Sequence, residues 1–347
     1  LDRVAKIISS TIGRFDPGEW STKHGPGAVA DLRSGADKYQ FPTWDAKLER
    51  VFPYADFAFA NYACWVDTVT GEEGVKVATD VEPPSKLILV PKTLKAPRLI
   101  ASEPTSHQWC QQALKAFFAS RSESTWIRSF VHFRDQTPNQ ELAVQGSRDG
   151  HLATVDLSEA SDRLTCWTVE RFFDGNTSLL DALQAVRTRW VENNLHPKLP
   201  RFHKLRKFAC MGSACTFPVQ SFVFLGVALA SVIYSRRLEP TLRNIRALRK
   251  QVRVFGDDIV VPVDSVGALM DMLEYLQLKV NRNKTFYTGR FRESCGVDAY
   301  GGTDVTPVYA LRYPDKTRPE SIVSSVATQQ NLFNQGLYAA ADYMAST

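Results

Sequence analysis

The chain has 347 residues, which is enough for one multi-lobed enzyme or for a few ordinary domains. Hydrophobic residues make up 44% and charged residues 23%, a composition that argues against disorder as the main state. The formal net charge of +5 is mildly basic and favours a polyanionic partner.

The six cysteines form neither a C-x-x-C pair nor a cluster with histidine at zinc spacing. This scatter argues against a zinc module and favours a reducing compartment with buried thiols. The first ten residues lack the apolar core and the cleavage site of a signal peptide. Because the chain opens with Leu rather than Met, we expect a trimmed or partial sequence.

Up to about residue 150, prolines and glycines interrupt the chain and predict short elements joined by loops. Within this part, Lys86–Val90 (KLILV) is typical of a strand. A helix is expected over Ser106–Ser120, after Pro104. We therefore predict a loop-rich N-terminal region with few regular elements.

The middle of the chain is more regular. The run His151–Val155 (HLATV) predicts a buried strand that ends at Asp156, and Ser158 is expected to open a helix. The apolar run from Thr216 to Tyr234 is barely of membrane-spanning length and contains proline, glutamine and serine. We interpret this run as a buried core helix, because short apolar runs are more often core than membrane spans.

Two strand-like runs, Val252–Phe255 and Ile259–Val263, are separated only by Gly-Asp-Asp and predict a hairpin. A helix is expected over Leu269–Leu278. Beyond it we expect strand pieces around 285–286 and 308–309, and one helix near 321–343. Strands and helices follow one another in mixed order rather than in βαβα alternation, so the predicted fold class is α+β.

The tip of the predicted hairpin carries the pair Asp257 and Asp258. A tight turn needs a permissive residue, and Gly256 supplies it. Two neighbouring carboxylates on an apolar platform repel each other, and divalent cations that prefer hard oxygen ligands, such as Mg²⁺ or Mn²⁺, offset this repulsion. The alternative is a plain, solvated hairpin turn.

A third carboxylate, Asp156, lies where the preceding apolar strand gives way to the expected helix. The alternative is that Asp156 or Ser158 caps this helix. Two-metal phosphoryl transfer requires carboxylates from separate strands that converge on ions about 3.5–4 Å apart. If the two strands are neighbours, Asp156 and the pair Asp257 and Asp258 meet this requirement. Together the two segments predict metal-dependent phosphoryl transfer.

These segments resemble motifs A and C of palm-type polymerases. The runs ATVDLSEASDRL, FGDDIVVP, KTFYTGRFRESCG and DVTPVY, in this order, are similar to the replicase catalytic (beta) subunit of the single-stranded RNA bacteriophages, the leviviruses. The resemblance implies a right-hand fold of fingers, palm and thumb with a central antiparallel palm sheet. It assigns residues 1–149 to a fingers-rich part, 150–300 to the palm with motifs A to E and a finger insertion, and 301–347 to a partial thumb or C-terminal region.

Two further segments receive roles from this resemblance. The run VPKTLKAPRLI corresponds to motif F, whose cations contact nucleotide phosphates, and the alternative is an exposed basic loop. The run CMGSACTFPVQ corresponds to motif B, where small residues let an RNA backbone approach and polar side chains hydrogen-bond a ribose; the alternative is a capped helix start. The assigned residues are Lys92, Lys95, Arg98, Ser213, Thr216 and Gln220 for NTP binding and Gly212 for RNA binding.

The position five residues after Asp156 bears on the choice of sugar. Reverse transcriptases, a sister family, carry an aromatic residue there that blocks a 2′-hydroxyl, whereas this chain has Ser161 followed by Asp162. This small, polar pair leaves room for a 2′-hydroxyl and offers it hydrogen-bond partners, which favours NTP over dNTP binding. Alternatively, Asp162 serves as a dipole partner in the first turn of the helix.

Two cationic residues near the end of the resemblance complete the expected site. Lys284 falls at motif D, where a lysine acts as the general acid that protonates the leaving pyrophosphate; the alternative is a plain surface lysine. Arg292 lies in a segment similar to motif E and is expected to bind RNA through a phosphate of the primer or product strand.

The expected activity is template-directed RNA synthesis from NTPs on an RNA template, as in viral genome replication, with Mg²⁺ as cofactor and Mn²⁺ as its substitute. By the resemblance, the partners are RNA, NTPs, host elongation factors Tu and Ts and a ribosomal protein, without a membrane, in the cytoplasm of the bacterial host. The competing interpretations are a reverse transcriptase or DNA polymerase, a non-catalytic RNA-binding protein or inactive polymerase remnant, and, more distantly, a two-metal nuclease.

Overall fold

The computed structural model describes residues 1–33, 35–39, 41–59, 61–70, 79–90, 97–310, 312, 314–315 and 317–346. Lys92 and Lys95, two of the expected NTP-phosphate ligands, lie outside these described residues. One continuous hydrophobic core joins buried side chains from Val4 to Leu278, so the N-terminal and middle parts of the chain fold around a shared interior.

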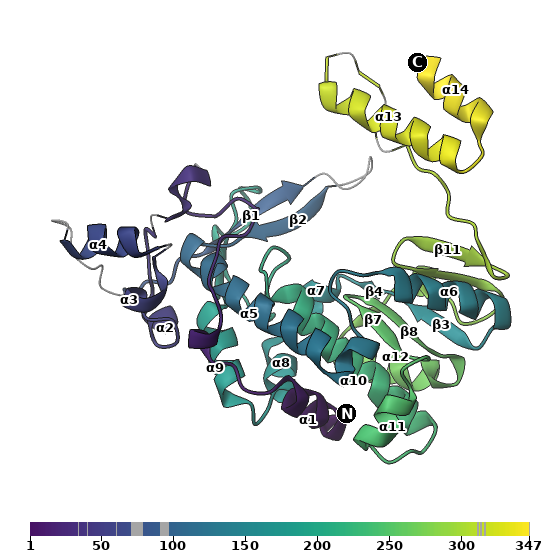
Figure 1. The fold of residues 1–347 in the computed structure, drawn as a ribbon, viewed down its shortest axis with the longest axis horizontal. Coiled ribbons are helices and arrows are strands. Elements are labelled where there is room, and N and C mark those ends of the chain that lie inside the picture. The colour runs from purple at the N-terminus through teal and green to yellow at the C-terminus, as the bar shows by residue number, and fades with distance from the viewer. Residues whose placement is uncertain are drawn as a thin grey trace.

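An antiparallel sheet with the strand order β3-β8-β7, here named the central sheet, lies toward the right of the molecule in Figure 1. Strands β7 (Arg253–Phe255) and β8 (Asp258–Pro262) form the expected hairpin, and β8 also pairs with β3 (Leu152–Val155). All four residues of β3 are buried, as are the last four of β8, which explains their nearly continuous apolar sequences. The predicted strand and hairpin are confirmed.

Helices cover the central sheet. Helix α6 (Thr137–Asp149) packs on β3, and α10 (Thr216–Ser235) packs on β7, β8 and α12 (Val266–Tyr275). Among the helices of the described residues, α10 alone is long and apolar enough to cross a membrane, and 94% of its most apolar window is buried inside the protein. This burial is that of a core helix, as expected.

Two small sheets flank the central one. The first contains β10 (Phe291–Ser294), β11 (Val297–Tyr300) and β12 (Thr303–Asp304), and the second pairs β4 (Leu157–Ser158) with β9 (Lys279–Val280). Ser158 therefore lies in a strand, and the short helix α7 (Ala160–Arg163) begins later than expected. The expected strand piece at 285–286 is a single bridge between Thr154 and Phe286.

A separate four-stranded sheet has the order β2-β1-β5-β6. Strands β1 (Ser85–Val90) and β2 (Arg98–Ser102) are joined to β5 (Trp190–Glu192) and β6 (Phe202–Lys204), which lie about a hundred residues later in the chain. The predicted strand at 86–90 is confirmed, whereas β5 and β6 were not predicted.

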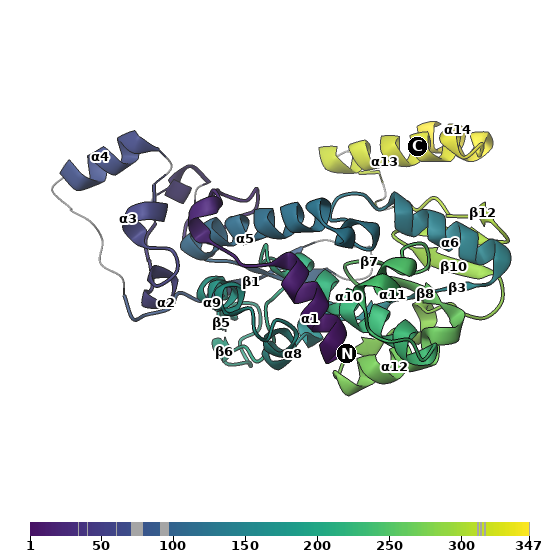
Figure 2. The ribbon, with the colours of Figure 1, turned by 60° about the horizontal axis from the view of Figure 1, so that its bottom comes forward.

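The long helix α5 crosses the middle of the molecule (Figures 1 and 2) and confirms the helix expected at 106–120. The remaining helices of four or more residues have the following bounds: α1 Asp2–Ile12, α2 Ala46–Glu49, α3 Tyr54–Phe57, α4 Tyr62–Thr70, α5 Thr105–Ser124, α8 Cys166–Phe172, α9 Thr177–Val186 and α11 Leu242–Ala247.

The C-terminal region departs from expectation. Two helices, α13 (Pro319–Asn334) and α14 (Tyr338–Ser346), replace the single predicted helix, because the chain turns back at Gly336, whose φ is 76°. No strand forms at 308–309. Figures 1 and 2 both show this helix pair standing apart from the rest of the molecule. The expected division into fingers, palm and partial thumb remains a prediction.

Candidate active site

Three carboxylates gather at one end of the central sheet. Val155 pairs with Ile259 in the β3–β8 ladder, so Asp156, the next residue along, lies opposite Asp258. Asp257 occupies the two-residue turn between β7 and β8. The two strands are neighbours, and the condition set by the sequence is therefore met.

Burial and mutual repulsion act on these carboxylates. Burial, with the negative charges of Asp257 and Asp156 adding to it, raises the pKa of Asp258 to about 6. Burial also raises the pKa of Asp156, and Asp257 contributes in the same direction. A bound cation would favour the charged forms of both groups, so the carboxylate set fits a hard divalent metal ion.

The carboxylates do not form a closed metal cage. Within the described residues, no group of three or more Asp, Glu, His or Cys side chains is arranged to hold a metal ion by itself. Magnesium is commonly bound by one or two carboxylates together with waters and substrate phosphates. The arrangement is therefore that of an open site whose remaining ligands would come from solvent and substrate.

Asp258 is held by the turn between β10 and β11. Its Oδ1 atom accepts hydrogen bonds from the backbone N of Cys295 at 3.1 Å and from the hydroxyl of Ser294 at 3.4 Å. One carboxylate oxygen is thus oriented by the motif E segment, which suits an assisting ligand better than a principal one. The sequence offered no signal for these two donors beyond their place in that segment.

Asp156 is held by Asn281, which sequence reasoning missed. The Asn281 side chain donates to Asp156 Oδ2 at 2.9 Å, and the Asn281 backbone N donates to the Asp156 carbonyl at 2.9 Å. Asp156 does not cap a helix, because the N-cap of α7 is Glu159, without a side-chain cap bond. Asn281 opens the run NRNK, in which only the lysine had attracted a role.

The turn between β7 and β8, which carries Gly256 and Asp257, packs on helix α10. The backbone N of Gly256 donates to the hydroxyl of Ser221 at 3.2 Å, and that hydroxyl donates to the Phe217 carbonyl at 2.8 Å. Gly256 has a φ of 63°, and a Cβ there would lie 2.7 Å from the Phe217 ring. A side chain at this position is therefore excluded by both conformation and space.

The three expected ribose ligands of motif B differ in what they offer. The Ser213 hydroxyl accepts from the Cys215 backbone N at 3.3 Å, and Thr216 donates to the Cys210 carbonyl at 2.8 Å. Gln220 is buried, and its Oε1 atom has no hydrogen-bond partner in the described part of the chain. Gln220 is thus the member of this set with an unused acceptor.

The motif B loop is clamped from two sides. On one side, the Ala101 backbone N in β2 donates to the Met211 carbonyl at 2.7 Å, and any side chain at Gly212 would collide with the Ala101 carbonyl. On the other side, Gln111 Oε1 in α5 accepts from the Ala214 backbone N at 3.1 Å. The glycine is thus required by the contact with β2, whatever its role toward RNA.

Gln111 connects this loop to a buried acid. Its Nε2 atom donates to Glu103 Oε2 at 3.1 Å, and the Thr188 hydroxyl donates to the same oxygen. Burial raises the pKa of Glu103. The end of β2, helix α5 and the motif B loop are therefore joined by one buried polar network.

The two sugar-selecting candidates lie in α7. Ser161 is 6% exposed, and Asp162 forms an ion pair with Lys207. Asp162 is in the first turn of α7, so its alternative role as a dipole partner is compatible with the structure. Lys207 belongs to the basic connector between β6 and the motif B loop, and thus links motif A to motif B.

The three remaining cations have different surroundings. Arg98 is exposed at the start of β2. Lys284 Nζ lies 2.8 Å from Glu293 Oε1, and this hydrogen bond raises the pKa of Lys284. Arg292, by contrast, is completely buried.

The environment of Arg292 contradicts its expected contact with RNA. Its Nε atom donates to the Leu152 carbonyl at 2.5 Å, and its Nη1 atom donates to the carbonyls of Thr288, Gly289 and Phe291. The guanidinium joins β10 to β3 and does not reach the surface. Arg292 is a structural residue of the sheet support rather than a phosphate ligand.

Comparisons with known proteins agree with this arrangement. The model of the family described as RNA replicase, beta-chain, matches residues 36–320. The RNA-directed RNA polymerase subunit beta of Qbeta virus (strain MX1) is 32% identical over 270 residues, which cover 75% of this chain and 42% of that protein. The RNA-directed RNA polymerase beta chain of Escherichia phage MS2 is 33% identical over 228 residues, 65% of this chain and 37% of that one. The chain thus spans about two-fifths of the length of these curated relatives.

Solved structures provide a second comparison. The RNA-dependent RNA polymerase from bacteriophage phi12 is similar with a TM-score of 0.52 and 13% identity, covering 85% of this chain and 54% of that one. An insertion-loop deletion mutant of the RNA-dependent RNA polymerase of a human picorbirnavirus gives 0.51 and 12%, covering 98% and 70%. At these identities the likeness shows the fold, and the predicted α+β class is confirmed.

Proposed function

Because the chain belongs to the RNA replicase beta-chain family, we propose that it carries the catalytic core of an RNA-directed RNA polymerase that copies an RNA template from NTPs. The observation that carries this proposal is the meeting of Asp156, at the end of β3, with Asp257 and Asp258 on the β7–β8 turn. Two-metal phosphoryl transfer needs carboxylates from separate strands in one place, and this meeting supports the proposal.

The three carboxylates take different parts. Asp156 and Asp257 are the principal metal ligands, and Asp258, with one oxygen engaged by the β10–β11 turn, assists. Divalent ions, Mg²⁺ with Mn²⁺ as substitute, would supply activation of the 3′-hydroxyl and neutralisation of the leaving phosphates. Asn281 keeps the Asp156 carboxylate oriented toward this position.

The incoming nucleotide would contact α7, the motif B loop and β2. Ser161 leaves space beside the ribose, and Asp162 and Gln220 offer acceptors for its 2′-hydroxyl. Arg98, exposed at the start of β2, would contact the phosphates. The family resemblance assigns the same role to Lys92 and Lys95, which lie outside the described residues. Ser213 and Thr216 shape the loop, and Gly212 keeps it close to β2.

Lys284 is the candidate general acid for pyrophosphate release. An ordinary lysine is already an ammonium at neutral pH, and the hydrogen bond to Glu293 raises its pKa further, which makes it a weaker proton donor while the contact lasts. Glu293 thereby positions the lysine. Transfer of the proton would require the lysine to leave Glu293 as the phosphates arrive.

The curated relatives are longer than this chain. We propose that this chain works in the cytoplasm of the bacterial host on RNA template and product. Host elongation factors Tu and Ts and a ribosomal protein are proposed partners through the family resemblance alone.

The test compares wild type with Asp257→Asn and with Asp271→Asn, a control at an exposed position of α12. Template-dependent incorporation of labelled NMP is measured with Mg²⁺ or Mn²⁺, and dNTPs are offered in a parallel reaction. We expect Asp257→Asn to lower incorporation by at least about a thousandfold. The reason is that it removes a proposed ligand of the metal ion that stabilises the negative charge of the transition state. Asp271→Asn should keep wild-type activity.

Equal activity in wild type and Asp257→Asn would remove Asp257 from the site. Preference for dNTPs would instead identify a DNA-synthesising enzyme on the same fold. If wild type is silent, the reaction is repeated with the longer replicase chain and the host elongation factors. Continued silence there would favour the inactive-remnant interpretation.

A further inference from the structure

One face of the four-stranded sheet is open to solvent. Because side chains alternate across a strand, the pairing register divides the sheet into two faces. The inner face contains Leu87, Ala101 and Val191, which pack on Cys210 and Leu205 of the chain leading into the motif B loop. By this register the outer face contains Lys86, Ile88, Val90, Arg98, Ile100, Ser102, Trp190, Glu192, Phe202 and Lys204. Of these, Ser102 is buried and donates to the Ala28 carbonyl.

The outer face combines aromatic rings with cations. Trp190 is 38% exposed and Phe202 48% exposed, and Lys86, Arg98 and Lys204 are exposed around them. The one acid in this set, Glu192, is neutralised by Arg201, whose Nη2 atom lies 2.7 Å from Glu192 Oε1. The net charge of the face is therefore positive.

Phe202 already carries a planar cation. The Arg201 guanidinium lies over its ring, 5.1 Å from the centroid. The flanking run from His196 to Phe208 adds further basic residues and contains no acid. A chain of phosphates approaching this edge would meet cations without a compensating repulsive group.

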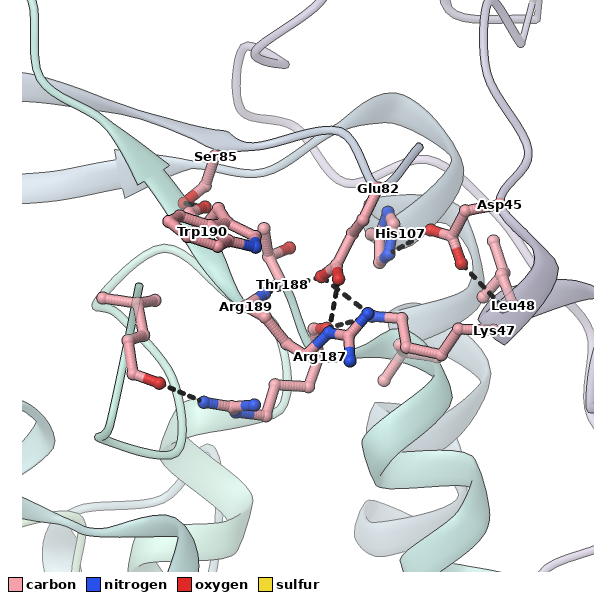
Figure 3. A network of polar contacts seen from close by, with 12 residues as sticks. Asp45, Lys47, Leu48, Glu82, Ser85, His107, Arg187, Thr188, Arg189 and Trp190 are labelled. Atoms are coloured by element: carbon pink, nitrogen blue, oxygen red, sulfur yellow. Dashed lines mark hydrogen bonds and ion pairs between the residues drawn. The ribbon is translucent and has the colours of Figure 1, made fainter. Parts of the chain in front are cut away.

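A buried polar network holds this face rigid (Figure 3). Glu82 accepts from the Arg189 backbone N at 2.7 Å and from Arg189 Nε at 2.5 Å, and Lys47 Nζ lies 3.1 Å from the same carboxylate. The Ser85 hydroxyl donates to the Trp190 carbonyl at 3.3 Å. The backbone that carries Trp190 is thus fixed on both sides before any ligand binds.

The same network reaches the catalytic region. Arg187, the residue that ends α9 three positions before Trp190, is buried. It donates to the Phe208 carbonyl at 2.6 Å and to the carbonyls of Leu205 and Lys207 at 2.9 Å. These bonds fix the connector between β6 and the motif B loop. A strand bound on the outer face would therefore be held at a constant distance from that loop.

We propose that the outer face of the four-stranded sheet, centred on Trp190 and Phe202, is a binding surface for single-stranded RNA. Unpaired bases stack on Trp190 and on the Arg201–Phe202 pair, and phosphates lie along Lys86 and Lys204. Single-stranded binding surfaces combine aromatic platforms with a positive groove in this way, whereas the centre of a protein interface is depleted of charged residues. The proposal rests on the proposed function in taking RNA as the ligand.

The first test measures binding without catalysis. A fluorescent single-stranded RNA of about 20 nucleotides is titrated with the protein in the absence of NTPs and divalent metal, and anisotropy is followed. The double variant Trp190→Ala/Phe202→Ala should bind at least about tenfold more weakly, because base–aromatic stacking contributes to each of two bases. The control Tyr275→Ala/Tyr300→Ala removes two rings that are 77% and 58% exposed elsewhere and should bind as wild type does.

The second test measures the charge contribution. Lys204→Gln should reduce the magnitude of the slope of log K against log salt by about 0.7, the value for one phosphate contact on a single strand. Lys250→Gln, an exposed lysine beyond helix α11, should leave the slope unchanged. Thermal unfolding of each variant confirms that the fold is retained.

Two outcomes would overturn the proposal. Unchanged RNA affinity in the double variant would show that the face serves another partner, such as a protein. If Tyr275→Ala/Tyr300→Ala lowers the RNA affinity equally, exposed aromatic rings contribute to RNA binding wherever they lie, and the outer face has no specific role. Asp257→Asn separates this proposal from the catalytic one: it should lose NMP incorporation yet bind the RNA in the metal-free assay as wild type does, whereas the double variant should lose RNA affinity.

Discussion

The central sheet and the four-stranded sheet differ in what their polar and charged side chains do. In the central sheet, buried strands end in carboxylates, and side chains such as Asn281 orient those carboxylates. In the four-stranded sheet, the charges lie partly behind the strands, where Glu82 and Lys47 fix the backbone, and one face remains uncovered. Polar groups thus orient the candidate catalytic carboxylates in the central sheet, and they fix the backbone behind an exposed face in the four-stranded sheet.

The support of the central sheet gives the largest expected effect on stability. Arg292→Met keeps the apolar part of the side chain but leaves the backbone carbonyls of Leu152 in β3 and Phe291 in β10 without their donor. We expect the free energy of unfolding to fall by about 3 kcal/mol or more, because each buried unsatisfied group costs about 1–3 kcal/mol. Urea unfolding measures it. Arg290→Met, an exposed neighbour, should change it by less than about 0.5 kcal/mol.

A surface role for Arg292 would give a different pattern. In that case Arg292→Met would leave the unfolding midpoint unchanged and would weaken RNA binding. The comparison of the two arginines therefore decides between a structural and a ligand-binding residue in this segment.

The carboxylate end of the central sheet predicts a dependence on pH. Burial raises the pKa of Asp258 to about 6, so in metal-free protein the neutral form stabilises the fold at low pH. This contribution is complete below the unfolded pKa near 3.8 and is lost as the pH rises through about 6. The expected loss is about 2 kcal/mol between these values.

Asp258→Asn should abolish most of this pH dependence, since the amide does not titrate. Unfolding in a chelating buffer at several pH values measures it, with Asp271→Asn as control. Addition of Mg²⁺ above pH 6 should stabilise wild type more than the variant. A pH profile shared by wild type and Asp258→Asn would contradict the electrostatic description of the site.

The link between the two sheets gives the smallest expected effect on stability. Gln111→Met leaves the Ala214 backbone N without its partner and the Glu103 carboxyl with the Thr188 hydroxyl alone, which we expect to cost about 1–2 kcal/mol. It should also raise the KM for NTP more than it lowers kcat, because the motif B loop is loosened while the carboxylates stay in place. Gln145→Met, exposed on α6, is the matched control. Equal changes in KM for both variants would argue against the clamp.

The two regions also differ in how far the sequence predicted them. The β7–β8 hairpin and β3 follow from local patterns, since apolar runs end in glycine or carboxylate within a few residues. The pairing of β1 with β5 joins segments about a hundred residues apart, and β5 has only three residues. Such short strands leave no periodic signal, and of the four strands in this sheet only β1 was predicted.

The same reasoning applies to the site. Asp156 and the pair on the turn were brought together as predicted, because strand ends at one edge of a sheet must meet. Arg292 was misjudged because a cation in a motif looks the same whether it faces solvent or carbonyls. Asn281 and Ser221 were missed because a single amide or hydroxyl gains its role only from a partner far along the chain.

Helix α10 has a consequence for how the chain is made. It is apolar enough to pass for a membrane span, and the elements that bury it come from both sides of the sequence: α1 before it, and β7, β8 and α12 after it. During synthesis, the apolar surface of α10 that packs on β7, β8 and α12 stays uncovered until residues near 275 have left the ribosome. We expect the nascent chain to depend on chaperones during that interval, and premature termination inside α12 to yield aggregates rather than a smaller folded protein.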